Sequence, residues 1–189
     1  ADFVACHNPS YIIKGFKMVR DVKPGGTFLV NCQWDDAEFA EKMPAAGKRY
    51  IAQNNINVYL IDAIDLAAKV GMGKRTNTVL QSAFFSLAKV LPPEDAIKYM
   101  KDAATKSYMK KGQAVVDANH KAIEAGASAY RKFEVPADWA NATDEPSTLT
   151  LEGREAIVKQ VKELLTPIDM MDGDSLPVSA FEDHADGQW

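Results

Sequence analysis

The sequence is poor in cysteine, with Cys6 and Cys32 as its two examples. Iron–sulfur clusters normally take four thiolate ligands, so this chain by itself does not supply a cluster site. The two cysteines do not form a Cys-x-x-Cys pair, which excludes the common zinc and thioredoxin-type motifs. Each cysteine ends a short apolar run, where reduced and buried thiols are common. We expect free thiols, with a disulfide as the alternative.

Long apolar runs and clustered charge of one sign are also absent. No apolar stretch approaches the roughly 20 residues that span a bilayer, and no signal-peptide pattern opens the chain. The net charge is −4 with Lys and Arg dispersed, so a nucleic-acid-binding surface is not indicated. The histidines are too widely spaced to predict a metal site; they are His7, His120 and His184. We expect a soluble, cytoplasmic protein without nucleic-acid or membrane partners.

Motifs for catalysis and phosphate binding are missing as well. The serine nucleophile motif Gly-x-Ser-x-Gly does not occur. Residues 71–74 contain two glycines and a lysine, but they follow a helical stretch and lack the Walker spacing. Their pattern favours a loop between helices. No residue of the chain is therefore predicted to be catalytic.

The first half of the sequence alternates between strands and helices. Continuous apolar runs predict buried strands at residues 2–6, 27–31 and 57–61. Helical patterns fall between and after them, at residues 9–22, 37–42 and 63–70. Pro44 and Gly47 predict a break and a turn before a brief strand at Tyr50–Ile51. Because parallel strands need crossover helices, we predict an α/β fold, a partial doubly wound and mainly parallel sheet with helices on its faces.

A helical C-terminal part follows. Its predicted helices cover residues 76–91, 93–111, 113–125 and 151–165, the last capped by Thr150. Residues 136–150 have the composition of a linker. Residues 166–189 contain two prolines and six acidic residues without periodicity, which predicts an extended connector. We divide the chain into residues 1–135, residues 136–165 and residues 166–189.

Polar residues stand where the predicted strands end. His7 and Asn8 follow the first strand, Asn31 ends the second, and Asp62 follows the third. Ligands of open α/β sheets bind outside the carboxyl ends of the strands, so these residues form a candidate ligand rim. The alternative is structural, because Asn8 and Asp62 are also suited to capping the helices that follow.

Several segments resemble the pyruvate:ferredoxin oxidoreductase family, also called pyruvate synthase. They are residues 1–11 (ADFVACHNPSY), 25–32 (GGTFLVNC), 57–63 (NVYLIDA) and 71–78 (GMGKRTNT). Residues 77–91 and 119–126 are similar to the end of the gamma-type domain of that family, and residues 176–181 and 186–189 to the connector behind it. The resemblance thus runs from end to end of the chain.

The resemblance implies a parent enzyme that decarboxylates pyruvate on thiamine diphosphate. Its electrons would pass through iron–sulfur clusters to ferredoxin or flavodoxin, and its acetyl group to coenzyme A. The thiamine-binding domains, the cluster cysteines and the glycine-rich opening of the gamma-type domain are not in this sequence. We therefore expect a fragment that is inactive alone and has no cofactor site of its own apart from a candidate coenzyme A contact. It should contact other domains of the parent, which we expect to be a homodimer.

Coenzyme A carries phosphates, which backbone donors and cationic side chains bind. The expected contact segment is residues 71–77, where two glycines allow close approach, two cations attract an anion and a helix begins. Its residues are Gly71, Gly73, Lys74, Arg75, Thr76 and Asn77. The second expected contact is the rim of His7, Asn8 and Asn31. The alternative function is a non-enzymatic structural or regulatory α/β binding module.

Overall fold

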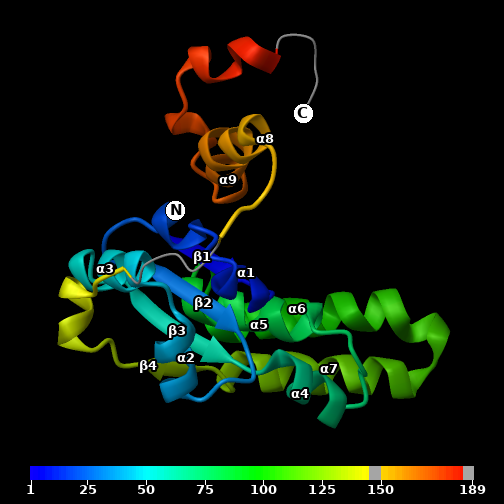
Figure 1. Cartoon of the computed structure of the whole chain (residues 1–189). Helices are drawn as coiled ribbons and strands as arrows, with labels where there is room; N and C mark the ends of the chain where they lie inside the picture. Colours follow the sequence, from blue (N-terminus) through cyan, green and yellow to red (C-terminus); the bar gives the residue numbers. More distant parts are fainter. Residues whose placement is uncertain (145–149, 185–189) are drawn as a thin grey trace.

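A four-stranded sheet forms the centre of the computed structural model, which describes residues 1–144 and 150–184 (Figure 1). The strands lie in chain order and are β1 (Phe3–Cys6), β2 (Thr27–Asn31), β3 (Asn57–Ile61) and β4 (Arg131–Phe133). The first three strands are parallel, with Phe28 beside Val58, and β4 is antiparallel to β3. Helices cover both faces, so the predicted α/β fold with a mainly parallel sheet is confirmed.

The connections after β1 and β2 cover one face of the sheet. They contain α1 (Ser10–Ile13), the 3-10 helix η1 (Met18–Asp21), α2 (Asp36–Lys42) and α3 (Ala45–Gln53). Phe28 and Val58 point into this layer, where Phe39 and Ile51 are fully buried. The 3-10 helix η3 (Ala137–Asn141) adds Trp139, whose ring lies 5.3 Å from that of Phe133. The layer therefore joins segments far apart in the sequence.

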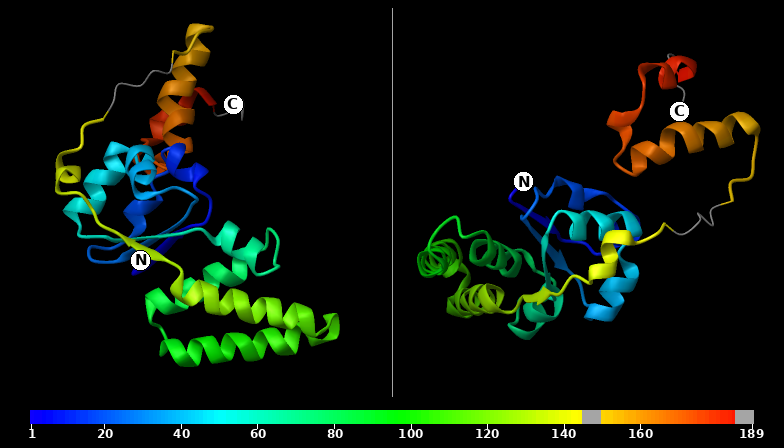
Figure 2. Two further views of the ribbon diagram at one scale, coloured as in Figure 1. Left: turned by 90° about the horizontal axis from the view of Figure 1, so that it is seen from below. Right: turned by 90° about the vertical axis from the view of Figure 1, so that its left-hand side faces the viewer.

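Helices that follow β3 cover the opposite face. They are α4 (Ala63–Lys69), α5 (Asn77–Ala88) and α7 (Gln113–Ser128), which bury Leu29 and Ile61 of the sheet against Val79 and Ala122. Between them, α6 (Pro93–Tyr108) and the 3-10 turn η2 (Met109–Lys111) lead back into α7. The hairpin of α6 and α7 projects away from the sheet (Figure 2).

A second, smaller helical segment follows residues 145–149, which are not described. It comprises α8 (Glu155–Gln160), the π-helical η4 (Val161–Leu165), α9 (Thr166–Asp169), η5 (Gly173–Ser175) and η6 (Val178–His184). Asp172 forms ion pairs with Lys17 and Arg20, and Met170 lies over Gly15. These contacts attach the segment to the loop around η1.

The predicted strand at Tyr50–Ile51 is wrong, since both residues lie in α3. The predicted break at Pro44 is confirmed, because α2 ends at Lys42 and Pro44, with ψ 147°, is the N-cap of α3. The predicted turn at Gly47 is wrong. Gly47 lies inside the helix, where a Cβ atom would come 2.8 Å from Met43 Sδ. The apolar pair therefore marks the buried side of a helix, with Ile51 in the core and the Tyr50 hydroxyl donating to Val22 O at 2.7 Å.

The continuous helix predicted over residues 9–22 is also wrong. Gly15 adopts φ +74°, which ends α1, and a separate 3-10 turn begins at Met18. Likewise, Arg154 rather than Thr150 precedes α8, and residues 166–184 form helical turns instead of an extended chain. Pro146, Ser147 and the expected connector motif at residues 186–189 lie outside the described residues. The domain boundaries stay a prediction.

Candidate functional site

Asn31 links the carboxyl ends of all three parallel strands. Its side-chain nitrogen donates to His7 O beyond β1 at 3.0 Å, and its side-chain oxygen accepts from Ala63 N at the start of α4 at 3.0 Å. Asn31 is 4% exposed, its bond to Ala63 is buried and its bond to His7 is partly buried. The convergence of strand ends expected from the sequence is therefore observed. The amide of Asn31 acts as a structural link in this arrangement.

The other rim residues take mostly local structural roles. Asn8 Oδ1 accepts from Ser10 N at 3.1 Å, and Asp62 Oδ1 accepts from Asp65 N at 2.9 Å as the N-cap of α4. The Asp62 bond confirms the capping alternative for that residue, whereas Asn8 precedes Pro9, the N-cap of α1, and its side chain bonds to the first residue of the helix. The His7 side chain is exposed at the same edge. Ligand contacts by His7, Asn8 and Asn31 stay a prediction.

A groove of about 640 Å³ opens beside this rim, at the ends of β2 and β3. Arg131 reaches it from β4, donating from Nε to Asp36 Oδ1 at 3.0 Å and from its guanidinium to Trp34 O at 2.9 Å. The Asp35 side chain caps α2 by accepting from Glu38 N at 2.8 Å. The sequence reasoning missed Arg131, because a three-residue strand has no periodicity to distinguish it from the linker.

Cys6 and Cys32 lie beneath the rim as free, buried thiols. Cys6 pairs with Val30 in the sheet, so Cys32 lies two positions further along the neighbouring strand. Strand geometry then separates their Cα atoms by roughly 8 Å, beyond the roughly 7 Å that a disulfide can bridge. The expected free thiols are confirmed. Burial raises the pKa of Cys32 and raises the pKa of Cys6 to about 11.

The raised pKa of Cys6 predicts a loss of stability at high pH. The unfolded thiol ionises near 9.0 and the folded one near 11, so the stabilising difference is complete below 9.0 and disappears as the pH rises through about 11. A difference of two pKa units corresponds to about 3 kcal/mol in full, of which about 2 kcal/mol is lost by pH 11. Urea unfolding at pH 8 and pH 11 should show the advantage of the wild type over Cys6→Ala shrinking by about this amount. An advantage independent of pH would contradict the prediction.

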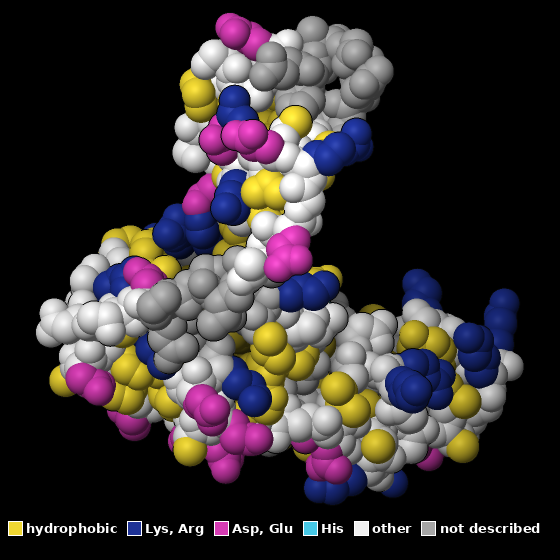
Figure 3. Space-filling model, in the orientation of Figure 1, with side chains coloured by type: hydrophobic (Ala, Val, Ile, Leu, Met, Phe, Trp, Pro, Cys, Tyr) yellow, Lys and Arg dark blue, Asp and Glu magenta, His cyan; other side chains and the backbone are white. Residues whose placement is uncertain are grey.

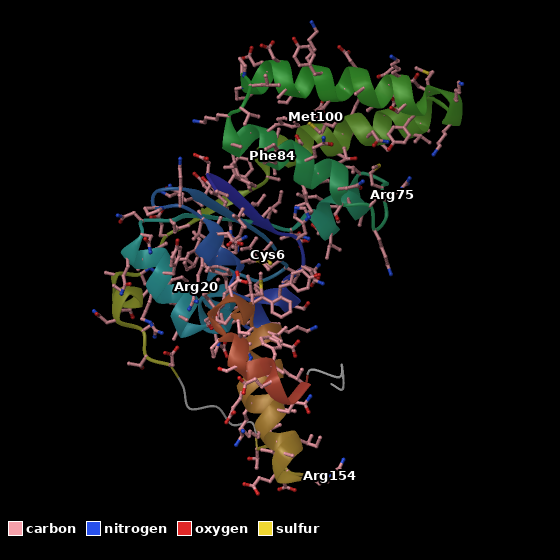
Figure 4. The ribbon with its side chains drawn as sticks, turned by 90° about the horizontal axis from the view of Figure 1, so that it is seen from above. Cys6, Arg20, Arg75, Phe84, Met100 and Arg154 are labelled. Atoms are coloured by element: carbon pink, nitrogen blue, oxygen red, sulfur yellow. The ribbon has the colours of Figure 1, made fainter. Side chains whose placement is uncertain are left out.

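The second predicted site, residues 71–77, lies on the far side of α4 from the rim. Gly71 and Gly73 have φ of +81° and +60°, a region that glycine enters without steric cost, and a Cβ atom would meet nothing within 4 Å at either position. Arg75 Nε donates to Met72 O at 3.0 Å, which anchors its side chain along the turn. Lys74 and Arg75 are exposed (Figure 4).

The start of α5 leaves backbone donors available at this turn. The intrahelical bonds begin with Leu80 N donating to Thr76 O at 3.0 Å, and the Thr76 side chain does not cap the helix. The first amides of α5 therefore need partners from solvent or a ligand. Two cations and free helix-start amides form a surface suited to an anion. The rim lies at the start of α4 and this turn follows its end, so the two candidate sites are separate.

Residues 1–144 and 150–184 contain neither a candidate metal site nor a membrane-spanning helix. Within these ranges, no three side chains of His, Cys, Asp or Glu gather in an arrangement that could hold a metal ion. None of the helices there has both the length and the apolar character needed to cross a bilayer. The polar features of the described chain are thus the strand-end rim and the turn before α5.

These features define an α/β segment with polar residues gathered at the strand ends and at one helix start. A family model described as "Pyruvate ferredoxin/flavodoxin oxidoreductase" matches residues 1–129, and the chain belongs to this family. It is 41% identical over 187 residues to the pyruvate-flavodoxin oxidoreductase of Enterobacter agglomerans, covering 99% of the chain. It is also 41% identical over 181 residues to the pyruvate:ferredoxin oxidoreductase of Moorella thermoacetica, covering 96% of the chain. The family resemblance of the sequence is confirmed.

The chain spans only 15% of the length of these two relatives. A solved structure with a similar fold is the pyruvate oxidoreductase subunit PORC of Thermotoga maritima, with a TM-score of 0.55 and 20% identity. The alignment covers 70% of this chain and 65% of that subunit. This likeness supports the fold, and the sequence relatives establish the family.

Proposed function

We propose that the chain is one segment of an enzyme that oxidatively decarboxylates pyruvate to acetyl-coenzyme A and passes electrons to ferredoxin or flavodoxin. The observation that carries the proposal is the 41% identity to two named pyruvate oxidoreductases over nearly the whole chain. In this proposal residues 1–135 are the C-terminal portion of a gamma-type domain. Residues 136–165 form a linker and helix, and residues 166–189 connect to a following domain.

The iron–sulfur clusters and the thiamine diphosphate of such an enzyme would be held outside this segment. Its two cysteines, Cys6 and Cys32, are buried among apolar side chains and do not fit the four-thiolate set of an iron–sulfur cluster. Thiamine diphosphate would supply the decarboxylation chemistry when bound elsewhere in the parent. We further propose a cytoplasmic homodimer, in which this segment acts as scaffold between domains.

We propose that coenzyme A is the ligand that contacts this segment. Its phosphates would lie at residues 71–77, where Lys74 and Arg75 supply charge and the first amides of α5 supply donors. Gly71 and Gly73 keep the approach open, because neither has a side chain and nothing packs above them. The rim of His7 and Asn8 is the second choice, since Asn31 already uses its amide within the fold.

Replacing Lys74 and Arg75 together with Ala in the full-length parent should raise the KM for coenzyme A by at least roughly 10-fold. Loss of one charge-assisted hydrogen bond costs about 1.5 to 3 kcal/mol, and each 1.4 kcal/mol is tenfold in affinity. Pyruvate decarboxylation without coenzyme A should stay unchanged, because these side chains would contact only the acyl acceptor. Steady-state kinetics with coenzyme A varied makes the measurement.

Lys121→Ala is the control, because it removes an exposed cation from α7, outside residues 71–77. It should leave the KM for coenzyme A unaltered. An unchanged KM in the double variant would exclude residues 71–77 and move the coenzyme A proposal to His7 and Asn8. A parent protein without pyruvate oxidation would instead support the alternative, a non-enzymatic binding module.

A further inference from the structure

A groove of about 380 Å³ separates α5 from α6. Both helices pack against α7, which supplies the floor through Asn119 and Ile123. The two walls meet near Leu91, where the chain turns from α5 into α6, and they diverge toward Asn77 and Tyr108. Figure 4 shows this divergence between the helices that carry Phe84 and Met100. The groove is thus a wedge between two helices of a three-helix layer.

The walls of the groove are uncharged and combine apolar side chains with neutral polar ones such as Gln81 and Ser107. α5 contains no charged residue, and the α6 face at positions 96, 100, 103 and 107 is Ala, Met, Ala and Ser. This spacing of 4, 3 and 4 residues places the four side chains on one side of the helix. Beside them, Tyr99 is 58% exposed and Leu91 41% exposed. From Ala96 to Tyr108 the wall is about 18 Å long, which matches a helix of about three turns.

The described remainder of the chain does not cover this groove. The helical segment from α8 to η6 lies over the loop around η1, where Asp172 pairs with Lys17 and Arg20. Figure 2 shows this segment, in orange and red, well away from the green hairpin of α6 and α7 in both views. A segment that fills this groove would therefore come from outside the described residues. About 85% of the length of the two named relatives lies beyond the region that this chain matches.

Charge at the open end of the groove indicates the kind of partner. Lys106, Lys110 and Lys111 lie there, and residues 103–116 contain no Asp or Glu. Lys111 Nζ lies 5.5 Å from the ring centre of Tyr108, a groove residue, which places its charge at the entrance. Figure 3 shows Lys and Arg side chains gathered over this end of the hairpin. An acidic end of a bound helix would complement these cations.

We propose that the groove receives an amphipathic helix from the part of the parent polypeptide outside residues 1–189. Its apolar side chains pack between Phe85 and Met100 on the floor formed by Ile123, and its acidic end lies beside Lys106 and Lys110. The helix completes a four-helix arrangement with α5, α6 and α7. The inference rests on the proposed function in one respect, that the chain is a segment of a larger polypeptide.

The reactivity of a cysteine introduced into the groove tests whether another segment covers the groove in the full-length parent. Ala103→Cys places a thiol in the groove, and Lys98→Cys places one on the opposite side of α6 as the matched control. Alkylation by N-ethylmaleimide should be at least tenfold slower in the parent than in the 189-residue chain for Ala103→Cys, and equal in both for Lys98→Cys. Equal rates for Ala103→Cys would overturn the proposal. Changing Lys106, Lys110 and Lys111 together to Glu should repel the acidic end of the bound helix and speed alkylation of Ala103→Cys in the parent. An unchanged rate would contradict the proposal that an acidic end lies beside these lysines.

Photocross-linking identifies the occupant. p-Benzoylphenylalanine in place of Ser107 in the full-length parent should cross-link within one polypeptide, to a helical segment outside residues 1–189. Peptide mapping by mass spectrometry gives the segment. A cross-link between two copies, one confined to residues 1–189, or none at all would contradict the proposal. Pyruvate oxidation of the unmodified parent is measured separately, so failure of the proposed function and of the groove inference can be told apart.

Discussion

Gly126→Ala is expected to destabilise the chain by about 3 kcal/mol, the upper part of the range for overpacked sites. Gly126 lies on α7 where this helix meets α5. A Cβ atom there would overlap the carbonyl oxygen of Val79 and lie 3.0 Å from Ser82 Cβ. Ser82 Oγ also donates to Ile123 O at 2.5 Å across this contact. The obstacle is helix backbone, so the two helices must move apart.

Urea unfolding of the 189-residue chain measures this effect, and Gly47→Ala is the matched control. Gly47 is also inside a helix, but its nearest neighbour is the flexible end of Met43, which can move aside. Ala has a higher helix propensity than Gly by about 1 kcal/mol, so the control should be neutral or slightly stabilising. Equal effects at the two positions would show that the α5–α7 contact is looser than the structure indicates.

Asn31→Ala is expected to cost about 3 kcal/mol. The change leaves the amide of Ala63 and the carbonyl of His7 without their partners, and each unsatisfied buried group costs about 1 to 3 kcal/mol. It also separates the end of β1 from the start of α4, so amide hydrogen exchange at Ala63 should accelerate. Both effects follow from the position of Asn31 at 4% exposure between the strand ends.

Asn8→Ala provides the comparison for this variant. Asn8 also has a side-chain oxygen at the rim, but its bond to Ser10 N is exposed to solvent, so water can replace it. A cost below about 1 kcal/mol is expected for Asn8→Ala. If Asn31→Ala were no more costly than Asn8→Ala, the rim would be open to water, and a ligand-binding role for Asn31 would become the better explanation.

The three parallel strands were predictable because each is a short apolar run, and the central strand β2 is buried on both faces. Residues such as Leu29 and Val30 are both buried, although they point to opposite sides of the sheet. Parallel direction then placed His7, Asn31 and Asp62 at one edge without any knowledge of contacts. The glycines at positions 71 and 73 likewise predicted a loop, and both residues have positive φ.

Other elements were not predictable, because their conformation depends on partners far away in the sequence. β4 is only three residues long and exists through pairing of Val58 with Phe133 and of Leu60 with Arg131. The apolar pair Tyr50–Ile51 could be half of a strand or one side of a helix, and packing decided for the helix. No local sequence pattern therefore indicated that Arg131 lies in the groove beside the strand-end rim.

The sequence by itself determined the family, the α/β class and the edge at which polar residues gather, because these follow from local apolar runs, chain order and recognisable segments. Tertiary structure alone decided what those residues do. It engaged both ends of the Asn31 amide, brought Arg131 to Asp36 across 95 residues, and set α5 and α6 apart on α7. Hydrogen bonds and helix packing between distant segments depend on three-dimensional distances, which residue order does not contain.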